Sequence, residues 1–255
     1  MCPIALEIGN LTIRWYGVMA AFAFITASYL LDKNRKFAGF TKDQCGTMLL
    51  IAMITGIIGA RVFYVIQFFQ YFRNDLIRVF YIHQGGLVFY GGFLLALASI
   101  IVYTRQKRLD TIRVLDVFAP AMAAAHGFGR IGCFLNGCCF GRATDTFWGV
   151  TAPAGSLLHM QTGGLPVHPV QLVEAAENFI LCILYCFMLK KGAKRGVVTG
   201  AYLLIYGILR CFNETLRGDN VLYFHLTPAQ WIGVLLIPAG AGMVYYFWRK
   251  DEKAA

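Results

Sequence analysis

The sequence has few charged residues. Only 14% of its 255 residues are Asp, Glu, Lys or Arg, whereas soluble domains carry about 25%. Its eight cysteines are too few for a disulfide framework in a chain of this length. Hydrophobic residues make up 58% of the chain, and the mean hydropathy is +0.60. These values exclude a disordered chain and an ordinary soluble globule, and they predict an integral membrane protein.

Long apolar segments recur along the whole chain. A helix that crosses a membrane needs about 20 predominantly apolar residues. Seven segments meet this requirement: 11–31, 45–69, 85–103, 114–134, 169–189, 196–212 and 227–248. We therefore expect an all-α polytopic membrane protein, in which residues 1–255 form a single domain of seven transmembrane helices.

The basic residues indicate how these helices are oriented. The connections after the first, third, fifth and seventh segments hold 15 Lys and Arg residues in total. The remaining connections hold only Arg73, Arg78, Arg142 and Arg217. Because cytoplasmic loops are enriched in Lys and Arg, the N-terminus is expected outside and the C-terminus in the cytoplasm. The net charge of +10 then reflects membrane orientation rather than nucleic-acid binding.

Two of the outer connections are more than short turns. Residues 70–84 mix aromatic, aliphatic and charged side chains, which is typical of an amphipathic helix at the membrane interface. Residues 142–168 form a long connection with Gly163, Gly164 and Pro166 near its end. Such a loop suits either a lid over a binding site or a solvated connector.

Several charged residues fall inside the predicted spans or at their edges. The arginines are Arg14, Arg61, Arg130 and Arg210, and the carboxylates at the same depth are Glu174, Glu177 and Glu214. A charge at the bilayer centre costs about 2.5–3.5 kcal/mol, so each needs a partner or a function. Arg210 and Glu214, one turn apart, suit a structural ion pair. The surplus arginine favours an external anion, and a phospholipid phosphate in the outer leaflet matches the planar guanidinium.

Glycines concentrate in two stretches, 85–92 and 127–141. Glycine in membrane helices usually serves close helix packing, and packing alone explains the first stretch. The second stretch surrounds Arg130 and ends a predicted span. A broken helix or a re-entrant loop at a ligand is therefore expected there.

At these residues the sequence resembles the prolipoprotein diacylglyceryl transferases. The matching segments are Arg14-Trp15-Tyr16-Gly17, residues 59–64 around Arg61, residues 85–92, Gly129-Arg130-Ile131-Gly132, Asn136-Gly137, Gly141-Arg142, residues 168–174, and Arg210, Glu214 and Arg217. The resemblance covers nearly the whole chain in the family's order, with the same seven-span topology.

The resemblance implies an enzyme of the bacterial plasma (inner) membrane whose active site faces the outer leaflet. Such an enzyme transfers the diacylglyceryl group of phosphatidylglycerol to the lipobox cysteine of a prolipoprotein signal peptide. The products are a thioether and glycerol phosphate. No metal, organic cofactor or nucleic acid is implied.

The resemblance also implies roles for individual residues. Arg130 and Arg210 would hold the lipid phosphate and stabilise charge on the leaving group. Asn136, Gly141 and Glu214 would shape the headgroup site, and Tyr16 would contact the lipid. The other substrate-binding residues expected from the matching segments are Arg61, Gly91, Gly92, His168, Gln171, Glu174 and Arg217.

The sequence departs from the family's pattern at the residues that would activate the thiol. Tyr90 precedes Gly91 and Gly92 where the family usually has a histidine, the candidate general base. Cys133 and Cys138 replace an asparagine and a glutamate. His126, one turn before Arg130, is a possible substitute base, because an imidazole near positive charge stays neutral. It is equally compatible with a histidine that only packs between helices.

The cysteines Cys133, Cys138 and Cys139 allow three interpretations. They can be small packing residues at a tight turn, a reactive thiolate that carries the lipid, or a redox pair or metal site. Their Cys-x4-Cys-Cys spacing is not a usual zinc pattern. The altered site also leaves two other functions open: transfer to a different acceptor, or non-catalytic lipid binding or transport.

Overall fold

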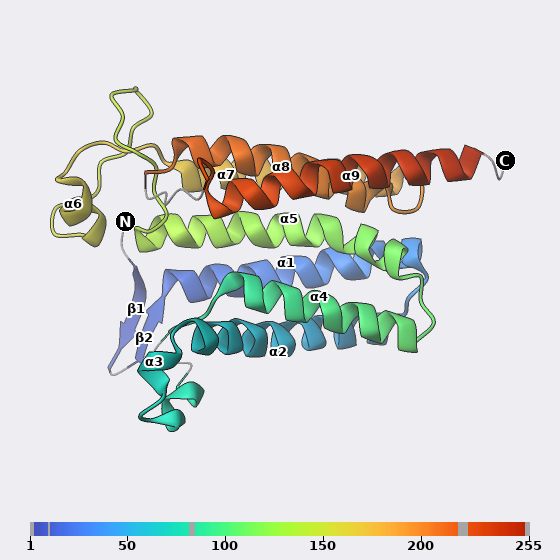
Figure 1. Cartoon of the computed structure of the whole chain (residues 1–255), viewed down its shortest axis with the longest axis horizontal. Helices are drawn as coiled ribbons and strands as arrows, with labels where there is room; N and C mark the ends of the chain where they lie inside the picture. The colour runs from blue at the N-terminus through green and yellow to red at the C-terminus, as the bar shows by residue number, and fades with distance from the viewer. Residues whose placement is uncertain (1–2, 10, 82–84, 219–223, 253–255) are drawn as a thin grey trace. The chain divides into compact units, whose positions relative to one another are not determined.

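The structure, a computed structural model, describes residues 3–9, 11–81, 85–218 and 224–252. Contacts within the chain divide it into two compact units. One comprises Met1–Asn34 and Leu115–Ala255, and the other Arg35–Val114. Long helices dominate both units (Figure 1).

A β-hairpin opens the first unit and was not predicted. Strand β1 (Ile4–Ile8) pairs antiparallel with β2 (Leu11–Arg14), with Gly9 in the left-handed region at the turn. Helix α1 (Trp15–Ala38) follows directly. The first apolar segment therefore begins as a strand and turns helical only at Trp15. The reason is local, because Thr12 and Ile13 have β-branched side chains and a partner strand lies beside them.

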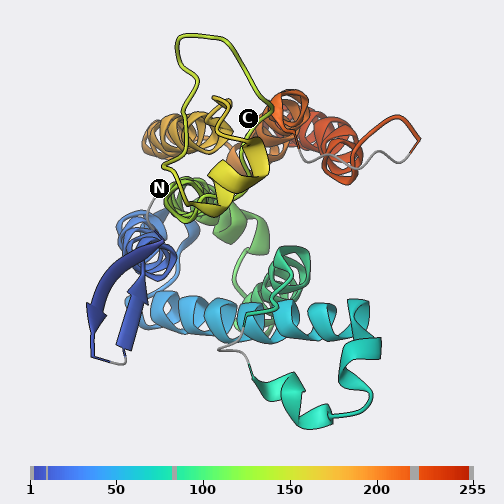
Figure 2. The same ribbon diagram turned by 90° about the vertical axis from the view of Figure 1, so that its left-hand side faces the viewer.

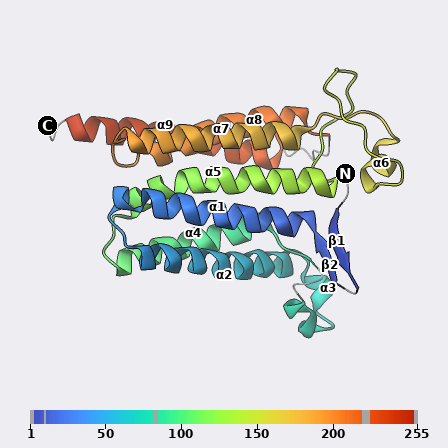
Figure 3. The ribbon, with the colours of Figure 1, turned by 180° about the vertical axis from the view of Figure 1, so that it is seen from behind.

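Four further long helices run side by side in the first unit: α5 (Thr111–Asn136), α7 (Val170–Lys190), α8 (Val197–Leu216) and α9 (Pro228–Glu252) (Figure 3). Helices α8 and α9 approach closely through glycines. A Cβ added to Gly240 would lie 2.4 Å from the backbone nitrogen of Leu204, so this crossing requires glycine.

Asp116 ties α5 to the start of α8. Its carboxylate accepts hydrogen bonds from the Gly196 N–H (2.7 Å), the Thr199 N–H (2.8 Å) and the Thr199 hydroxyl (2.7 Å). The side chain is fully buried. Asp116, in α5, thus caps the N-terminus of α8. This role explains why α5 has a buried carboxylate near its start, away from the charged residues near its end.

The connection 142–168 has a small core of its own. It contains helix α6 (Leu157–Thr162), capped by Ser156, and its buried residues Ala152, Leu158 and Val167 pack together. The backbones of Val150 and Val167 pair across it. The connection is therefore a folded element and not only a solvated loop.

The second unit consists of α2 (Lys42–Gln67), α3 (Phe69–Phe72), the 3-10 helix η1 (Leu76–Phe80) and α4 (Phe89–Gln106) (Figure 2). In place of the single amphipathic helix predicted for 70–84 there are two short helices. The break falls before Asp75, whose side chain accepts the Ile77 N–H and starts η1. Residues 82–84 lie outside the described residues.

Each of the seven predicted spans coincides with a long helix. Within the described residues, α1, α2, α7 and α9 are long and apolar enough to cross a membrane. Helix α4 has only 18 residues, and α5 and α8 carry the buried charges described below. The expectation of a mostly helical membrane protein is confirmed, with the hairpin as an addition.

Candidate active site

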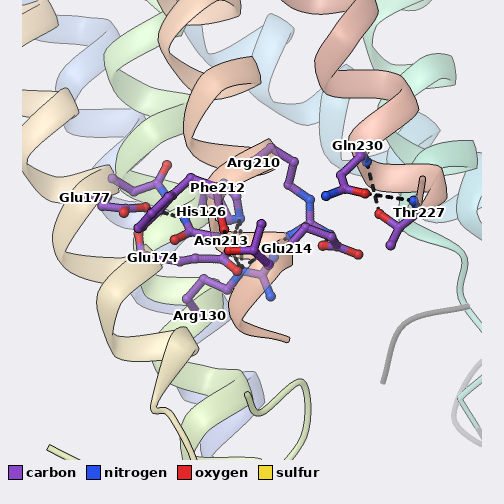
Figure 4. A network of polar contacts seen from close by, with 12 residues as sticks. His126, Arg130, Glu174, Glu177, Arg210, Phe212, Asn213, Glu214, Thr227 and Gln230 are labelled. Atoms are coloured by element: carbon purple, nitrogen blue, oxygen red, sulfur yellow. Dashed lines mark hydrogen bonds and ion pairs between the residues drawn. The ribbon is translucent and has the colours of Figure 1, made fainter. Parts of the chain in front are cut away.

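A cluster of charged side chains joins α5, α7 and α8 (Figure 4). Arg130 Nε lies 2.7 Å from Glu174 Oε2, and Arg210 Nη1 lies 3.6 Å from Glu174 Oε1. Arg210 Nη2 also contacts Glu214 Oε2 at 3.0 Å. Glu174 is only 3% exposed. One buried carboxylate therefore holds two guanidinium groups that come from different helices.

His126 belongs to the same cluster. Its Nε2 accepts a hydrogen bond from Arg130 Nε at 3.1 Å and lies 3.8 Å from Glu174 Oε2. The ring packs against Tyr206 with centroids 5.7 Å apart. Because its Nε2 lone pair is engaged by a cation, this nitrogen is poorly placed to take a proton from a thiol. The contact joins the His126 ring to Arg130, and the catalytic role of His126 stays a prediction.

Asparagines complete the cluster and were not predicted. Asn213 Nδ2 donates to Glu177 Oε2 at 2.6 Å, and Asn178 Nδ2 donates to the Glu174 carbonyl oxygen at 2.7 Å. Both asparagines are buried. The available signal was their position: each is a polar residue in an apolar helix, within one turn of a charged member of the cluster.

The two arginines keep N–H groups for a ligand. Within the described residues, Arg130 contacts its partners through Nε only. Arg210 Nη1 is buried and makes no hydrogen bond to any described residue. A buried donor without an acceptor is unfavourable, so oxygen atoms of an anion would stabilise this arrangement.

The space beside the cluster is small. The cavity there has a volume of about 10 Å³, enough for one water molecule, and its lining includes His126, Glu174 and Arg210. A larger cavity of about 450 Å³ lies on α8 and α9; its lining is apolar apart from Arg249 and includes none of the predicted site residues.

Arg130 and Arg210 face Glu174 and Glu214, so these two cations meet two carboxylates. Arg217 adds a further cation near Glu174. Among the described residues, the cluster therefore offers an anion both an unused N–H group and this additional positive charge.

Arg61 lies in the second unit and binds backbone. Its five N–H groups donate to carbonyl oxygens at 2.6 to 3.4 Å, those of Arg78, Val79, Tyr81, Gly85 and Gly86. Its guanidinium also lies over the rings of Tyr64 and Phe72. Since these contacts use every donor, Arg61 anchors the end of η1 and the described residues Tyr81, Gly85 and Gly86.

Tyr90, Gly91 and Gly92 form the first turn of α4 in the second unit. Tyr90 is 44% exposed. The two glycines are buried against α2, where a Cβ on Gly91 would lie 2.5 Å from the Gly59 carbonyl oxygen. This geometry matches the packing interpretation of the first glycine stretch.

Backbone hydrogen bonds join the chain after α5 to the start of α7 and the end of α8. The Gly141 N–H donates to His168 O (3.0 Å), the Arg142 N–H to Leu216 O (2.9 Å), and the His168 N–H to Arg142 O (3.1 Å). Gly141 also pairs with Arg217. A Cβ at Gly141 would lie 2.7 Å from His168 O, so only glycine fits there.

The cysteine-containing turn is held on two sides. Gln171 Nε2 donates to the Cys138 carbonyl oxygen at 2.8 Å, and Asn136 Nδ2 lies 3.7 Å from Cys138 Sγ. The sulfur atoms of Cys133, Cys138 and Cys139 all lie within 4.8 Å of one another. The structure thus brings the three predicted thiols together.

Tyr16 lies beside this turn. Its ring packs against Gly132 of α5, where an added Cβ would come within 3.0 Å. The residue is 51% exposed. The first unit therefore gathers Tyr16, the thiols and the charged cluster along α5.

Comparison with known proteins gives the same family along the whole chain. The family model described as prolipoprotein diacylglyceryl transferase matches residues 3–246. A phosphatidylglycerol–prolipoprotein diacylglyceryl transferase of Clostridium botulinum (strain Langeland) is 34% identical, covering 99% of this chain and 100% of the relative. That of Clostridium kluyveri (strain ATCC 8527) is 35% identical, covering 92% and 94%.

Proposed function

The chain belongs to the prolipoprotein diacylglyceryl transferase family, and we propose that it transfers the diacylglyceryl group of phosphatidylglycerol to a prolipoprotein cysteine. The relatives carry that activity in their names and match the chain over nearly its full length. The transfer forms a thioether and releases glycerol phosphate. The observation that carries the proposal within this chain is the pair of largely buried arginines, of which Arg210 Nη1 makes no hydrogen bond to any described residue and is left for an anion.

Arg130 and Arg210 bind the phosphate of the lipid in this proposal. Negative charge grows on the phosphate oxygen as the bond to the glyceryl carbon breaks. Guanidinium groups already held by Glu174 and Glu214 stabilise that charge without first reorganising. The carboxylates are therefore positioning residues.

His126 serves as a second positioning residue for Arg130, through the hydrogen bond from Nε. Gly141 and Arg217, paired through their backbones, bring the end of α8 to the headgroup site. Asn136, His168 and Gln171 line the same edge. Tyr16, half-exposed, contacts the lipid chains.

The membrane arrangement follows from the basic connections. We place seven spans across the bacterial plasma membrane, with the N-terminus outside and the active site at the outer leaflet. The basic residues in the last turns of α1, α4, α7 and α9 and in the connections that follow them then lie in the cytoplasm. Residues 142–168 stand on the outer side as a lid, and 70–84 lie at the interface.

A direct assay tests the function. Purified protein is incubated with phosphatidylglycerol and a peptide that contains a lipobox cysteine, and the peptide is weighed by mass spectrometry. We expect a gain of one diacylglyceryl group on the cysteine. An unmodified peptide would overturn the proposal, and release of glycerol phosphate in that sample would indicate another acceptor.

A further inference from the structure

Three thiols meet where α5 ends. The sulfur atoms of Cys133, Cys138 and Cys139 lie within 4.8 Å of one another, and all three residues are free cysteines that are partly exposed. They therefore present three ligand atoms of one kind around a single, partly exposed point.

The turn after α5 is built to bring these thiols together. Gly137 and Cys139 both adopt left-handed backbone conformations, and the Cys138 N–H donates to the Cys133 carbonyl oxygen at 3.1 Å. These features fold the two later cysteines back over the last helical turn. A left-handed cysteine costs about 1–2 kcal/mol, and the hydrogen bond from Gln171 of α7 helps to hold the turn.

The spacing of the sulfurs suits zinc. Zn–S bonds of about 2.3 Å at tetrahedral angles place the sulfur atoms roughly 3.8 Å apart. Thiols within 4.8 Å reach this distance by small side-chain rotations. Three protein ligands with an open fourth position are typical of catalytic zinc, whereas structural zinc has four. The unusual sequence spacing does not prevent zinc binding, because the turn after α5 places Cys138 and Cys139 next to Cys133.

We propose that Cys133, Cys138 and Cys139 bind one Zn²⁺ ion as thiolates, and that its fourth position takes the acceptor cysteine of the prolipoprotein. The proposal rests on the proposed function, since the acceptor is the substrate of that reaction. It gives this chain a means of activating the thiol, for which Nε2 of His126 is poorly placed.

The chemistry balances without a redox change. Zinc binding releases the three cysteine protons to water, and the acceptor thiol loses its proton on coordination. The acceptor sulfur then attacks the glyceryl carbon next to the phosphate. A C–S bond forms, the C–O bond breaks, and the bonding electrons leave with glycerol phosphate.

Nearby cations offset the negative charge of the complex. Zinc with three thiolates carries one net negative charge, and the acceptor thiolate adds another. Arg130 and Arg217 both interact electrostatically with Cys139. Tyr16, the proposed lipid contact, lies near all three thiols. The metal site is therefore next to the residues assigned to the lipid.

Metal content is the first test. The full chain is purified in detergent with a reductant, loaded with Zn²⁺ and freed of excess metal. Its zinc content is then measured by inductively coupled plasma mass spectrometry. We expect about one zinc ion per chain in the wild type and in Cys182→Ser, a matched control in α7. Cys138→Ser should hold roughly tenfold less.

Cobalt substitution tests the fourth position independently of turnover. Co²⁺ bound by thiolates gives a sulfur-to-metal absorption band. A lipobox peptide should strengthen this band by adding a fourth sulfur, and a peptide with serine in place of the cysteine should not. An unchanged band with the cysteine peptide would overturn the role of the acceptor.

Activity is the third readout. Removal of zinc by a chelator should lower transfer roughly a hundredfold, and added Zn²⁺ should restore it.

Wild-type protein that binds no zinc, or that transfers at full rate after chelation, overturns the proposal. So does a disulfide among the three cysteines of active protein. Zinc-loaded protein that binds the peptide but never transfers contradicts the proposed function, while the zinc site stands.

Discussion

Glu174 connects two arginines from different helices through its two carboxylate oxygens. Glu174 is buried, so losing this contact is expensive, because a buried cation without a partner is unfavourable. The sequence placed Glu174 at the same depth as Arg130, Arg210 and Glu214, but it did not pair Glu174 with either arginine. Which carboxylate meets which arginine depends on helix rotation, which periodicity alone does not determine.

Replacing Glu174 tests this connecting role. Glu174→Gln should lower the free energy of unfolding by about 3–5 kcal/mol, because it leaves two buried guanidinium groups without their shared anion. Thermal unfolding in detergent measures the change. Glu177→Gln is the matched control, since Glu177 contacts an asparagine and no arginine among the described residues. Equal unfolding temperatures for the two variants would contradict the role of Glu174.

Gly141 is fixed by contact with backbone. Gly141→Ala places a Cβ 2.6 Å from His168 Cβ and 2.7 Å from its carbonyl oxygen, so the strand-like pairing must shift. We expect a destabilisation of about 1–3 kcal/mol together with loss of transfer. Gly242→Ala, where an added Cβ meets nothing within 4 Å, should be neutral or stabilising. Full transfer by Gly141→Ala would show that the pairing is dispensable.

At the level of elements, apolar length predicted the helices well and their ends poorly. Seven apolar segments coincide with seven long helices, because burial in lipid requires continuous apolar residues. The hairpin was missed because the apolar residues Leu11 and Ile13 lead directly into the apolar helix after them. The helix expected at 70–84 is interrupted by local capping at Asp75, which composition does not reveal.

Arg61 is expected to order the segment between η1 and α4. Arg61→Lys keeps the charge but loses most of the five hydrogen bonds. Amide hydrogen exchange of residues 76–81 should accelerate by roughly tenfold or more. Arg78→Lys provides the control, since the exposed Arg78–Asp75 pair contributes little. An unchanged rate of amide hydrogen exchange in Arg61→Lys would contradict the anchoring role of Arg61.

Asp116 is expected to fix α8 against α5. Asp116→Asn replaces one acceptor oxygen with an N–H₂ group that faces backbone N–H groups, so we expect a loss of about 1–3 kcal/mol. Urea unfolding monitored by circular dichroism measures it. The same substitution at the exposed cap Asp110 should cost little, because asparagine caps helices as well as aspartate. Similar losses at both positions would contradict a special role for Asp116.

For the whole molecule, composition and the order of the motifs were sufficient to predict the membrane class and the family. The comparisons confirm both the family and the transferase activity. Counting charged residues along the sequence predicted the anion site less well, because it assigned all arginines at the same membrane depth to one site. Arg61 uses its donors on backbone carbonyls, Arg14 is exposed at the end of β2, and Arg130 and Arg210 contact carboxylates.

The most direct measurement is the rate of lipobox peptide lipidation by Arg210→Lys at saturating phosphatidylglycerol. Lysine preserves the positive charge but cannot contact Glu174, Glu214 and a phosphate with one planar group. We predict a loss on the order of a hundredfold or more, with no loss in the control Arg249→Lys, which lies near the end of α9. Transfer by Arg210→Lys at the wild-type rate would contradict the assignment of the phosphate site to this cluster.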